Sequence, residues 1–183
     1  MNRKTLEDQF WLGGSKGASW ALNARRLKRS GDLVLEANNN ALERMMDSTP
    51  LPSDIDTEIA GCAMLLYGLS LENLIKGVII ANNPSLASRT AAPRWRGNGH
   101  ELTQLFDQAE IELDDPDKDI VIRLSAFVTW AGRYPIPKSV DKMVIRQDGF
   151  SRPYFPMPFG RREMARFNRL FGSLINRLVR MKK

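Results

Sequence analysis

The stretch IAGCAMLLYGLSLENLIKG, residues 59–77, decides the fold class of this chain of 183 residues. Between residues 59 and 71, apolar side chains occur on every side of a helical projection, which is typical of a helix surrounded by protein. Charge enters only with Glu72 and Lys76, which are four residues apart in the order that favours an ion pair within a helix. We therefore predict a helix over residues 54–80 that lies at the centre of the fold.

Four more helices are predicted around this centre from apolar residues spaced three and four apart. The acids and proline at Asp114–Pro116 suit the first turn of a helix, and Pro135 and Pro137 stop that helix. The last two helices are joined by a stretch with five prolines, which predicts an irregular connection with a short hairpin around residues 144–150. The four predicted helices cover residues 16–46, 100–109, 115–133 and 160–183.

These segments predict an all-α protein, and the missing alternation of strands and helices argues against a Rossmann or P-loop enzyme. A faint phosphate-loop pattern at Gly13–Gly17 lacks the full spacing and a preceding strand, so a flexible lead into the first helix explains it better. The predicted organisation has four parts: an N-terminal extension at 1–15, a helical bundle at 16–134, a proline-rich connection at 135–159 and a basic amphipathic helix at 160–183.

The composition, with 43% hydrophobic and 26% charged residues, is ordinary for a soluble globular protein. Cys62 is the only cysteine and lies in the apolar stretch, which predicts a buried, inert thiol in a reducing compartment. The N-terminus has no apolar signal core, and the apolar run at 59–71 is shorter than the roughly 20 residues that a bilayer needs. We expect a cytoplasmic protein with no membrane contact.

The net charge of +6 is concentrated at the C-terminus. Residues 161–183 hold eight lysines and arginines and one acid, so the rest of the chain is close to neutral. Concentrated positive charge suits a polyanion such as RNA or DNA, and we expect Arg162, Arg166 and Arg169 to contact a nucleic-acid backbone. The solvated face of an amphipathic helix explains the same charge equally well.

His100 is the only histidine of the chain. It follows Arg94, Trp95 and Arg96 and opens the predicted helix at 100–109. One imidazole excludes a multi-histidine metal site, and we expect no metal and no cofactor. Histidine is the side chain best suited to proton transfer near neutral pH, and arginine is suited to holding a phosphate. The pattern is therefore sufficient for metal-free acid–base chemistry on a phosphodiester.

The order of elements between Trp20 and Tyr134 resembles the HEPN superfamily. The resemblance rests on Leu-Glu-Asn-Leu-Ile-Lys at 71–76, Gly-His-Glu-Leu at 99–102 and Trp-Ala-Gly-Arg-Tyr-Pro at 130–135. It implies an up-and-down helical bundle, commonly a homodimer, to which this chain adds the basic C-terminal helix. Many members are metal-independent endoribonucleases of toxin–antitoxin, abortive-infection and CRISPR systems. RNA and an antitoxin or another antiviral defence protein are therefore the implied partners.

The resemblance also implies a catalytic pair. HEPN ribonucleases carry an arginine, four to six residues and then a histidine, and five residues separate Arg94 from His100. Arg94 is then expected to hold the scissile phosphate, while His100 moves the proton of the 2′-hydroxyl or of the leaving group. This chain departs from active members in two ways. Trp95 stands where they carry a polar residue, and the glycines at 97 and 99 argue against one helix that holds both catalytic residues.

Six further residues are expected to bind the substrate, namely Trp95, Arg96, Glu72, Lys76, Arg133 and Tyr134. Each site residue also has a structural interpretation. Trp95 can anchor the loop to the bundle, and Glu72 with Lys76 can form a surface or dimer-interface pair. Arg133 and Tyr134 can end a helix, with the tyrosine packed into the core. His100 itself can bond to the backbone or to Glu72 without taking part in catalysis.

Three functions remain open at this point. The first is an RNA-cleaving HEPN protein, a defence or toxin component. The second is a non-catalytic HEPN module that dimerises and binds nucleic acid or a protein. The third is a helical bundle that binds an anionic small molecule with the loop from Arg94 to His100.

Overall fold

The computed structural model of the chain describes residues 2–47, 59–134, 136–139, 144–147, 150–153 and 156–181. Within these residues it is a helical bundle with one antiparallel pair of short strands, which confirms the predicted all-α class. The elements in chain order are α1 (Arg3–Ser15), α2 (Gly17–Asp47), α3 (Ala60–Asn82), the 3-10 turn η1 (Pro84–Leu86), α4 (Leu102–Gln108), α5 (Asp115–Ala126), the π-helical turn η2 (Phe127–Ala131), β1 (Val144–Gln147), β2 (Phe150–Pro153) and α6 (Arg161–Arg180).

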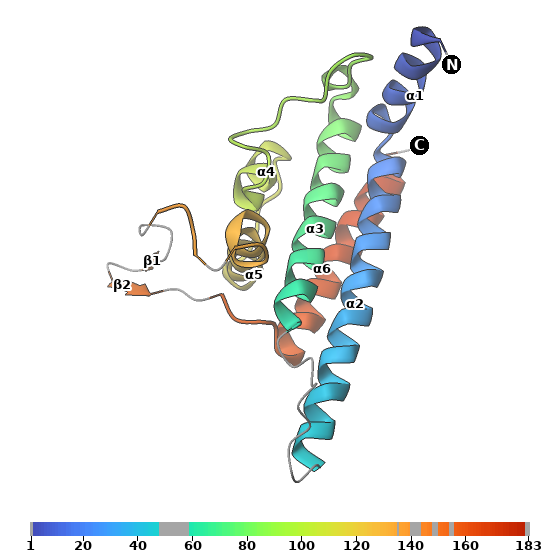
Figure 1. Ribbon diagram of the computed structural model, residues 1–183. Helices are drawn as coiled ribbons and strands as arrows, with labels where there is room; N and C mark the ends of the chain where they lie inside the picture. The colour runs from blue at the N-terminus through green and yellow to red at the C-terminus, as the bar shows by residue number, and fades with distance from the viewer. Residues whose placement is uncertain are drawn as a thin grey trace.

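Helix α3 lies at the centre, and α2, α4, α5 and α6 pack around it (Figure 1). Of its 23 residues, 15 are buried, as the apolar stretch predicts. The helix begins at Ala60, and the earlier part of the predicted helix, residues 54–58, lies outside the described residues. Because α3 continues to Asn82, beyond the apolar run at 59–71, it is long and apolar enough to span a bilayer by length and composition alone. Most of the apolar window, 78%, is instead buried inside the protein, as in a core helix.

Glycines let the long helices approach one another closely. A Cβ added to Gly31 of α2 would lie 2.8 Å from the ring of Tyr67 in α3. A Cβ added to Gly68 of α3 would lie 2.5 Å from Val128 of η2. Tyr67 is fully buried, and its hydroxyl donates a hydrogen bond of 3.0 Å to Asp32 of α2. These contacts fix how α2 and η2 sit against the central helix.

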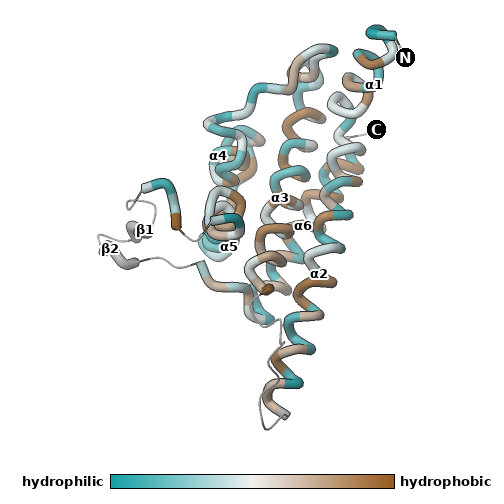
Figure 2. Tube along the Cα trace, in the orientation of Figure 1, coloured by the Kyte–Doolittle hydropathy of each residue, from teal (hydrophilic) through white to brown (hydrophobic). Residues whose placement is uncertain are grey.

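The C-terminal helix α6 packs against α3 and α5 of the same chain. Figure 2 shows hydrophobic positions, in brown, along α3, against which the apolar stripe of α6 packs. The stripe supplies the buried residues Phe167, Leu170, Phe171, Leu174 and Leu178. The predicted stripe is therefore part of the core of this chain.

Several local predictions need correction. The predicted flexible lead at Gly13–Gly17 is mostly helical, because α1 continues through Ser15 and α2 starts at Gly17. Helix α4 starts at Leu102, so His100 lies just before the helix rather than in its first turn. The fourth helix changes to a π-helical turn at Phe127, where the sequence predicted an unbroken helix.

Two further predictions concern the hairpin around residues 144–150 and the burial of Cys62. The hairpin expected around residues 144–150 is confirmed as two antiparallel strands, in which Val144 pairs with Pro153 and Gln147 with Phe150. Cys62 was predicted to be buried, but it is exposed. It occupies the first turn of α3 on a side that the other described elements do not cover, so local apolarity was a poor guide to burial there.

Candidate functional site

A buried ion pair lies in the middle of α3. Lys76 Nζ donates a hydrogen bond of 2.6 Å to Glu72 Oε1, and the two residues are only 6% and 5% exposed. Taking two charges out of water is costly, and the cost is offset only when their geometry is good and their other polar atoms are also paired. The ion pair predicted between Glu72 and Lys76 is therefore present, but it lies inside the protein and not on its surface. The second oxygen of Glu72 needs a partner of its own.

His100 supplies that partner. Its ring nitrogen Nδ1 lies 3.0 Å from Glu72 Oε2, and its backbone N–H donates to Asn98 Oδ1. A carboxylate acceptor at Nδ1 favours the tautomer that has its proton there. The imidazole side chain is 47% exposed, and Nε2 has no hydrogen-bond partner in the described part of the chain. A ring held at Nδ1 and open at Nε2 is arranged to accept and return a proton.

The segment from Arg94 to His100 is a loop, as its glycines indicated. Gly97 and Gly99 have φ values of +58° and +74°, a region that residues with a Cβ rarely adopt. The backbone N–H of Arg96 donates to Gln108 Oε1 of α4, which ties the loop to the bundle. Arg94 and His100 are therefore held by a tight turn and not by a shared helix.

Trp95 anchors this loop. Its ring meets the ring of Trp20 edge to face, with centroids 5.7 Å apart, and Lys76 Nζ lies 5.2 Å from the centre of the Trp95 ring. A Cβ at Gly99 would lie 2.9 Å from Trp95 Cδ1, so the turn is packed directly on the indole. These contacts match the anchoring interpretation of Trp95. They also place the lysine of the buried pair beneath the loop that carries His100.

Ser125, which no sequence pattern singled out, positions the start of α4. Its hydroxyl accepts a hydrogen bond of 2.9 Å from the backbone N–H of Leu102 and lies 3.3 Å from Glu101 Oε2. Residues this far apart in the chain share no local pattern. Ser125 thus fixes the helix start that directly follows His100.

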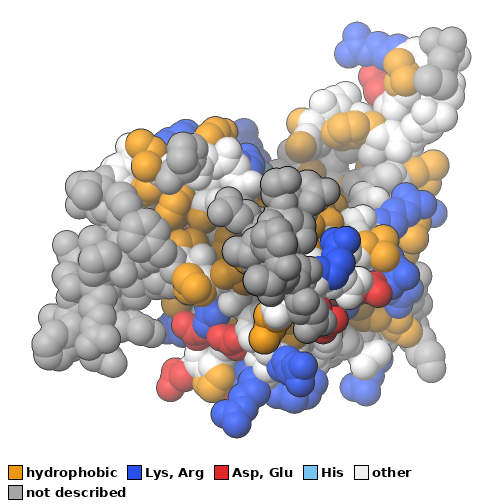
Figure 3. Space-filling model, turned by 60° about the horizontal axis from the view of Figure 1, so that its bottom comes forward, with side chains coloured by type: hydrophobic (Ala, Val, Ile, Leu, Met, Phe, Trp, Pro, Cys, Tyr) orange, Lys and Arg blue, Asp and Glu red, His pale blue; other side chains and the backbone are white. Residues whose placement is uncertain are grey.

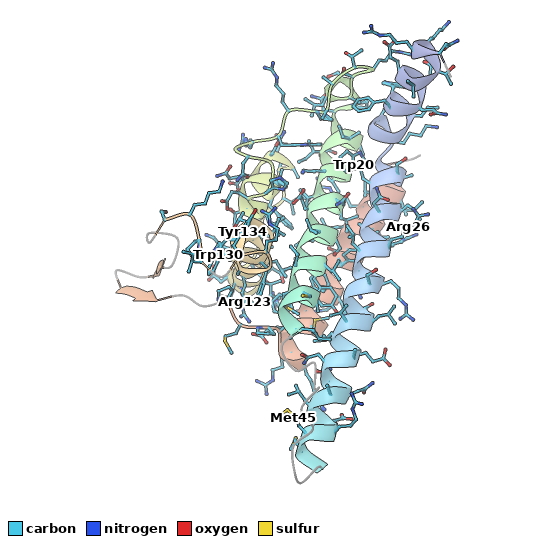
Figure 4. All side chains as sticks on the ribbon, viewed as in Figure 1. Trp20, Arg26, Met45, Arg123, Trp130 and Tyr134 are labelled. Carbon is cyan, nitrogen blue, oxygen red and sulfur yellow. The ribbon has the colours of Figure 1, made fainter. Side chains whose placement is uncertain are left out.

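The predicted arginines fall into two groups. Arg94 and Arg96 are exposed, and their guanidinium groups form no ion pair within the described residues. Arg133 lies with its guanidinium 5.4 Å from the centre of the Tyr134 ring and donates to Thr129 O. Figure 4 shows Tyr134 close to Trp130, on the side of the bundle away from Arg26. Tyr134 is 52% exposed, so it ends the helix without packing into the core.

Arg166 differs from its predicted neighbours on α6. Its Nε donates to Asp117 Oδ1 at 2.6 Å, and its terminal nitrogen pairs with Asp114. A hydrogen bond from the Asp117 backbone and the pairing with Arg166 hold the pKa of Asp114 below its usual range. With these donors occupied, Arg166 joins α6 to α5, whereas Arg162 and Arg169 are exposed and unpaired in the described region.

The basic side chains do not form one uninterrupted surface. Figure 3 shows the end of the bundle where α6 begins, and Lys and Arg side chains there alternate with Asp and Glu. Glu163 of α6 pairs with Arg123 of α5 at 2.8 Å, and Arg166 of α6 pairs with Asp114 and Asp117. Part of the positive charge that pointed to a polyanion is thus neutralised by the protein itself.

Neither a metal cluster nor either of two sizeable cavities lies at His100 in the part of the chain that the structure describes. No group of three or more His, Cys, Asp or Glu side chains is placed to hold a metal ion there. Cavities of about 530 and 430 Å³ are lined by residues other than His100. The His100 side chain is about half exposed and lines neither of these two cavities.

Comparison of the chain with protein-family models, with curated proteins and with solved structures found no match.

Proposed function

We propose that the Glu72–His100 pair is the proton-transfer centre of a metal-independent endoribonuclease of HEPN type. The observation that carries the proposal is the half-exposed imidazole, held at Nδ1 by a buried carboxylate and open at Nε2. A carboxylate that orients a histidine in this way is a recurring device in acid–base catalysis. The two unpaired arginines of the same loop, Arg94 and Arg96, are available to hold a phosphate.

The proposed step is a transfer within the substrate. His100 Nε2 takes the proton of a ribose 2′-hydroxyl, and that oxygen attacks the neighbouring phosphorus. The bond from phosphorus to the 5′-oxygen breaks, and the leaving oxygen takes a proton from the now protonated His100, which returns the imidazole to its starting state. The products are a 2′,3′-cyclic phosphate and a 5′-hydroxyl. An arginine beside the phosphate stabilises the negative charge that develops on its oxygens.

Glu72 would act as a positioning residue. It is buried, so it cannot touch RNA, and its role is to hold the ring in one tautomer and one orientation. Lys76 would hold the Glu72 carboxylate in place from the other side. We further propose that the chain forms a homodimer that brings two His100 residues to one cleft. Light scattering that reports a monomer at micromolar concentration would contradict the dimer.

The test is cleavage of mixed RNA in EDTA. His100→Ala is expected to lower the rate by about 10² to 10⁴, which is the usual contribution of a general acid–base group. Glu72→Gln is expected to lower kcat while KM for RNA stays nearly unchanged. DNA of the same sequence should remain whole because it has no 2′-hydroxyl, and circular dichroism checks that each variant is folded.

A non-catalytic RNA-binding or protein-binding module is the second candidate. It is favoured by Trp95, which is packed against Trp20 and Lys76, and by the exposed setting of His100 outside the cavities described above. Wild-type protein that binds RNA and leaves it whole would support this candidate. Cleavage that is lost in EDTA would contradict the metal-free step.

A further inference from the structure

The N-terminal helix α1 covers a cavity that the proposed nuclease site does not use. The cavity, of about 430 Å³, lies between α1, the first turns of α2 and the loop before Arg94. Its lining consists of Phe10, Gly13, Gly14, Ser19, Trp20, Leu22, Asn23, Ala87, Ser88, Ala91, Ala92 and Pro93. The volume falls within the range of roughly 300–1,000 Å³ that small-molecule sites occupy.

The residues that line the cavity determine which class of ligand it can bind. The lining contains no charged side chain, although charged residues follow closely on both walls, with Lys16 after α1 and Arg89 in the loop. Phe10 and Trp20 provide aromatic surfaces, and the loop wall is formed by alanines and a proline. The side chains of Ser19 and Asn23 make no hydrogen bond within the described residues. A neutral ring with one or two polar atoms matches such walls, because it buries apolar area and satisfies these groups.

Two adjacent glycines leave the space open. Gly13 and Gly14 lie in the last turn of α1, and a Cβ added to either would meet no atom within 4 Å. Glycine is an unfavourable residue inside a helix, so helix formation alone does not account for the pair. Both glycines line the cavity, and neither adds a side chain to its wall.

Helix α1 is attached by few contacts. None of its residues is buried. It is held by a hydrogen bond of 2.9 Å from Trp20 Nε1 to Gly14 O and by Arg89, which pairs with Asp8 and lies 5.4 Å from the centre of the Trp11 ring. Phe10 at the cavity is 48% exposed. An occupant of the cavity would add contacts to a helix that has few of its own.

We propose that this cavity is a binding site for a neutral, mainly apolar small molecule with an aromatic ring, clamped between α1 and the loop at Ala87–Pro93. The site does not depend on the function proposed for His100. A ligand there would touch the residues directly before Arg94, and it would increase the stability of α1 against the bundle.

The test uses a matched pair of fluorescent probes, the neutral N-phenylnaphthylamine and its anionic sulfonate, anilinonaphthalene sulfonate. The wild-type protein is expected to bind one neutral probe per chain, at least about tenfold more tightly than the sulfonate, because the walls offer the anion no partner. Absence of saturable binding of the neutral probe, or equal binding of the sulfonate, would overturn the proposal.

Two variants locate the site. Gly13→Leu fills the cavity from the helix, and its matched control is Gly172→Leu on α6, where an added Cβ also meets no atom within 4 Å. We expect Gly13→Leu to weaken binding of the neutral probe by about tenfold or more, and Gly172→Leu to change it by less than about twofold. Ala92→Leu fills the same space from the loop and does not depend on the folding of α1. Equal binding by both cavity variants and the control would place the probe elsewhere and refute the assignment.

Discussion

The Glu72–Lys76–His100 cluster and the ion pairs between α5 and α6 are both built from acids and bases, but they leave different groups free. In the first cluster the charged pair is buried, and its second carboxylate oxygen holds Nδ1 of an imidazole side chain that is about half exposed. In the second, Arg123 and Arg166 have acids around their guanidinium groups. Charge that is fully satisfied inside the protein stabilises the fold, whereas a partly satisfied group can still react with a substrate.

The largest expected effect comes from breaking the buried pair. Lys76→Met removes the cation and leaves Glu72 buried with His100 as its remaining side-chain partner among the described residues. Loss of one partner of a buried ion pair typically costs about 3–5 kcal/mol of unfolding free energy. Urea denaturation followed by circular dichroism measures the change. A loss no greater than that of a surface substitution such as Arg96→Met would show that the pair is not desolvated.

A smaller loss is expected at the α5–α6 contact. Arg123 donates to Asp119 at 2.6 Å and to Glu163 at 2.8 Å, and its guanidinium lies 5.3 Å from the centre of the Phe159 ring. Arg123→Met should lower the unfolding free energy by about 2 kcal/mol, the usual size for hydrogen bonds to a charged group. Arg162→Met is the matched control on α6 and should change it little. Equal losses of unfolding free energy for the two variants would show that Arg123 does not stabilise the contact between α5 and α6.

The same contact predicts a dependence on pH. Burial raises the pKa of Glu163, but a hydrogen bond from the Gly160 backbone and the pairing with Arg123 outweigh it, so the pKa lies below its usual range. The contribution of Glu163 is therefore complete above the ordinary glutamate pKa of about 4.3 and is lost as the pH falls through the lower folded value. Glu163→Gln should flatten the acid side of the stability curve. Glu112→Gln, which alters an exposed acid outside these pairs, should leave the curve unchanged.

The smallest expected effect concerns nucleic-acid binding by α6. If Arg162 and Arg169 contact a single-stranded backbone, reversing either charge should flatten the slope of log affinity against log salt by about 0.7 for each lost contact. Arg166→Glu should instead act mainly on stability, since it places a third acid beside Asp114 and Asp117. A filter-binding titration across salt concentrations separates the two results. An unchanged slope for the variants at Arg162 and Arg169 would show that the basic side of α6 is a solvated helix face.

Local patterns predicted much of the bundle. The long helices α2, α3 and α6 were placed within a few residues of their observed bounds where these are described, because apolar spacing and terminating prolines are local properties of the chain. The helical state of α1 and the π-turn at Phe127 were missed. The first lacks a buried face, and the second depends on what packs against the end of α5.

Only part of the candidate site followed from the sequence. The pair of Glu72 and Lys76 is visible in the spacing of two residues on one helix. A bond from His100 to Glu72, 28 residues away, was one of the interpretations that the sequence left open, and packing of the loop onto α3 forms it and buries the pair. The same holds for Arg166, whose partners Asp117 and Asp114 lie 49 and 52 residues earlier in the chain.

The sequence by itself determined an all-α chain with a buried central helix, one histidine and a basic last helix, because periodicity, composition and charge need no knowledge of neighbours in space. The tertiary structure decided which charged groups form ion pairs within the protein and which stay exposed. It placed Glu72 and Lys76 inside the protein, left one edge of His100 in solvent, bound Arg166 to α5 and exposed Cys62. Contacts between distant residues depend on how whole elements pack, and no local pattern encodes that packing.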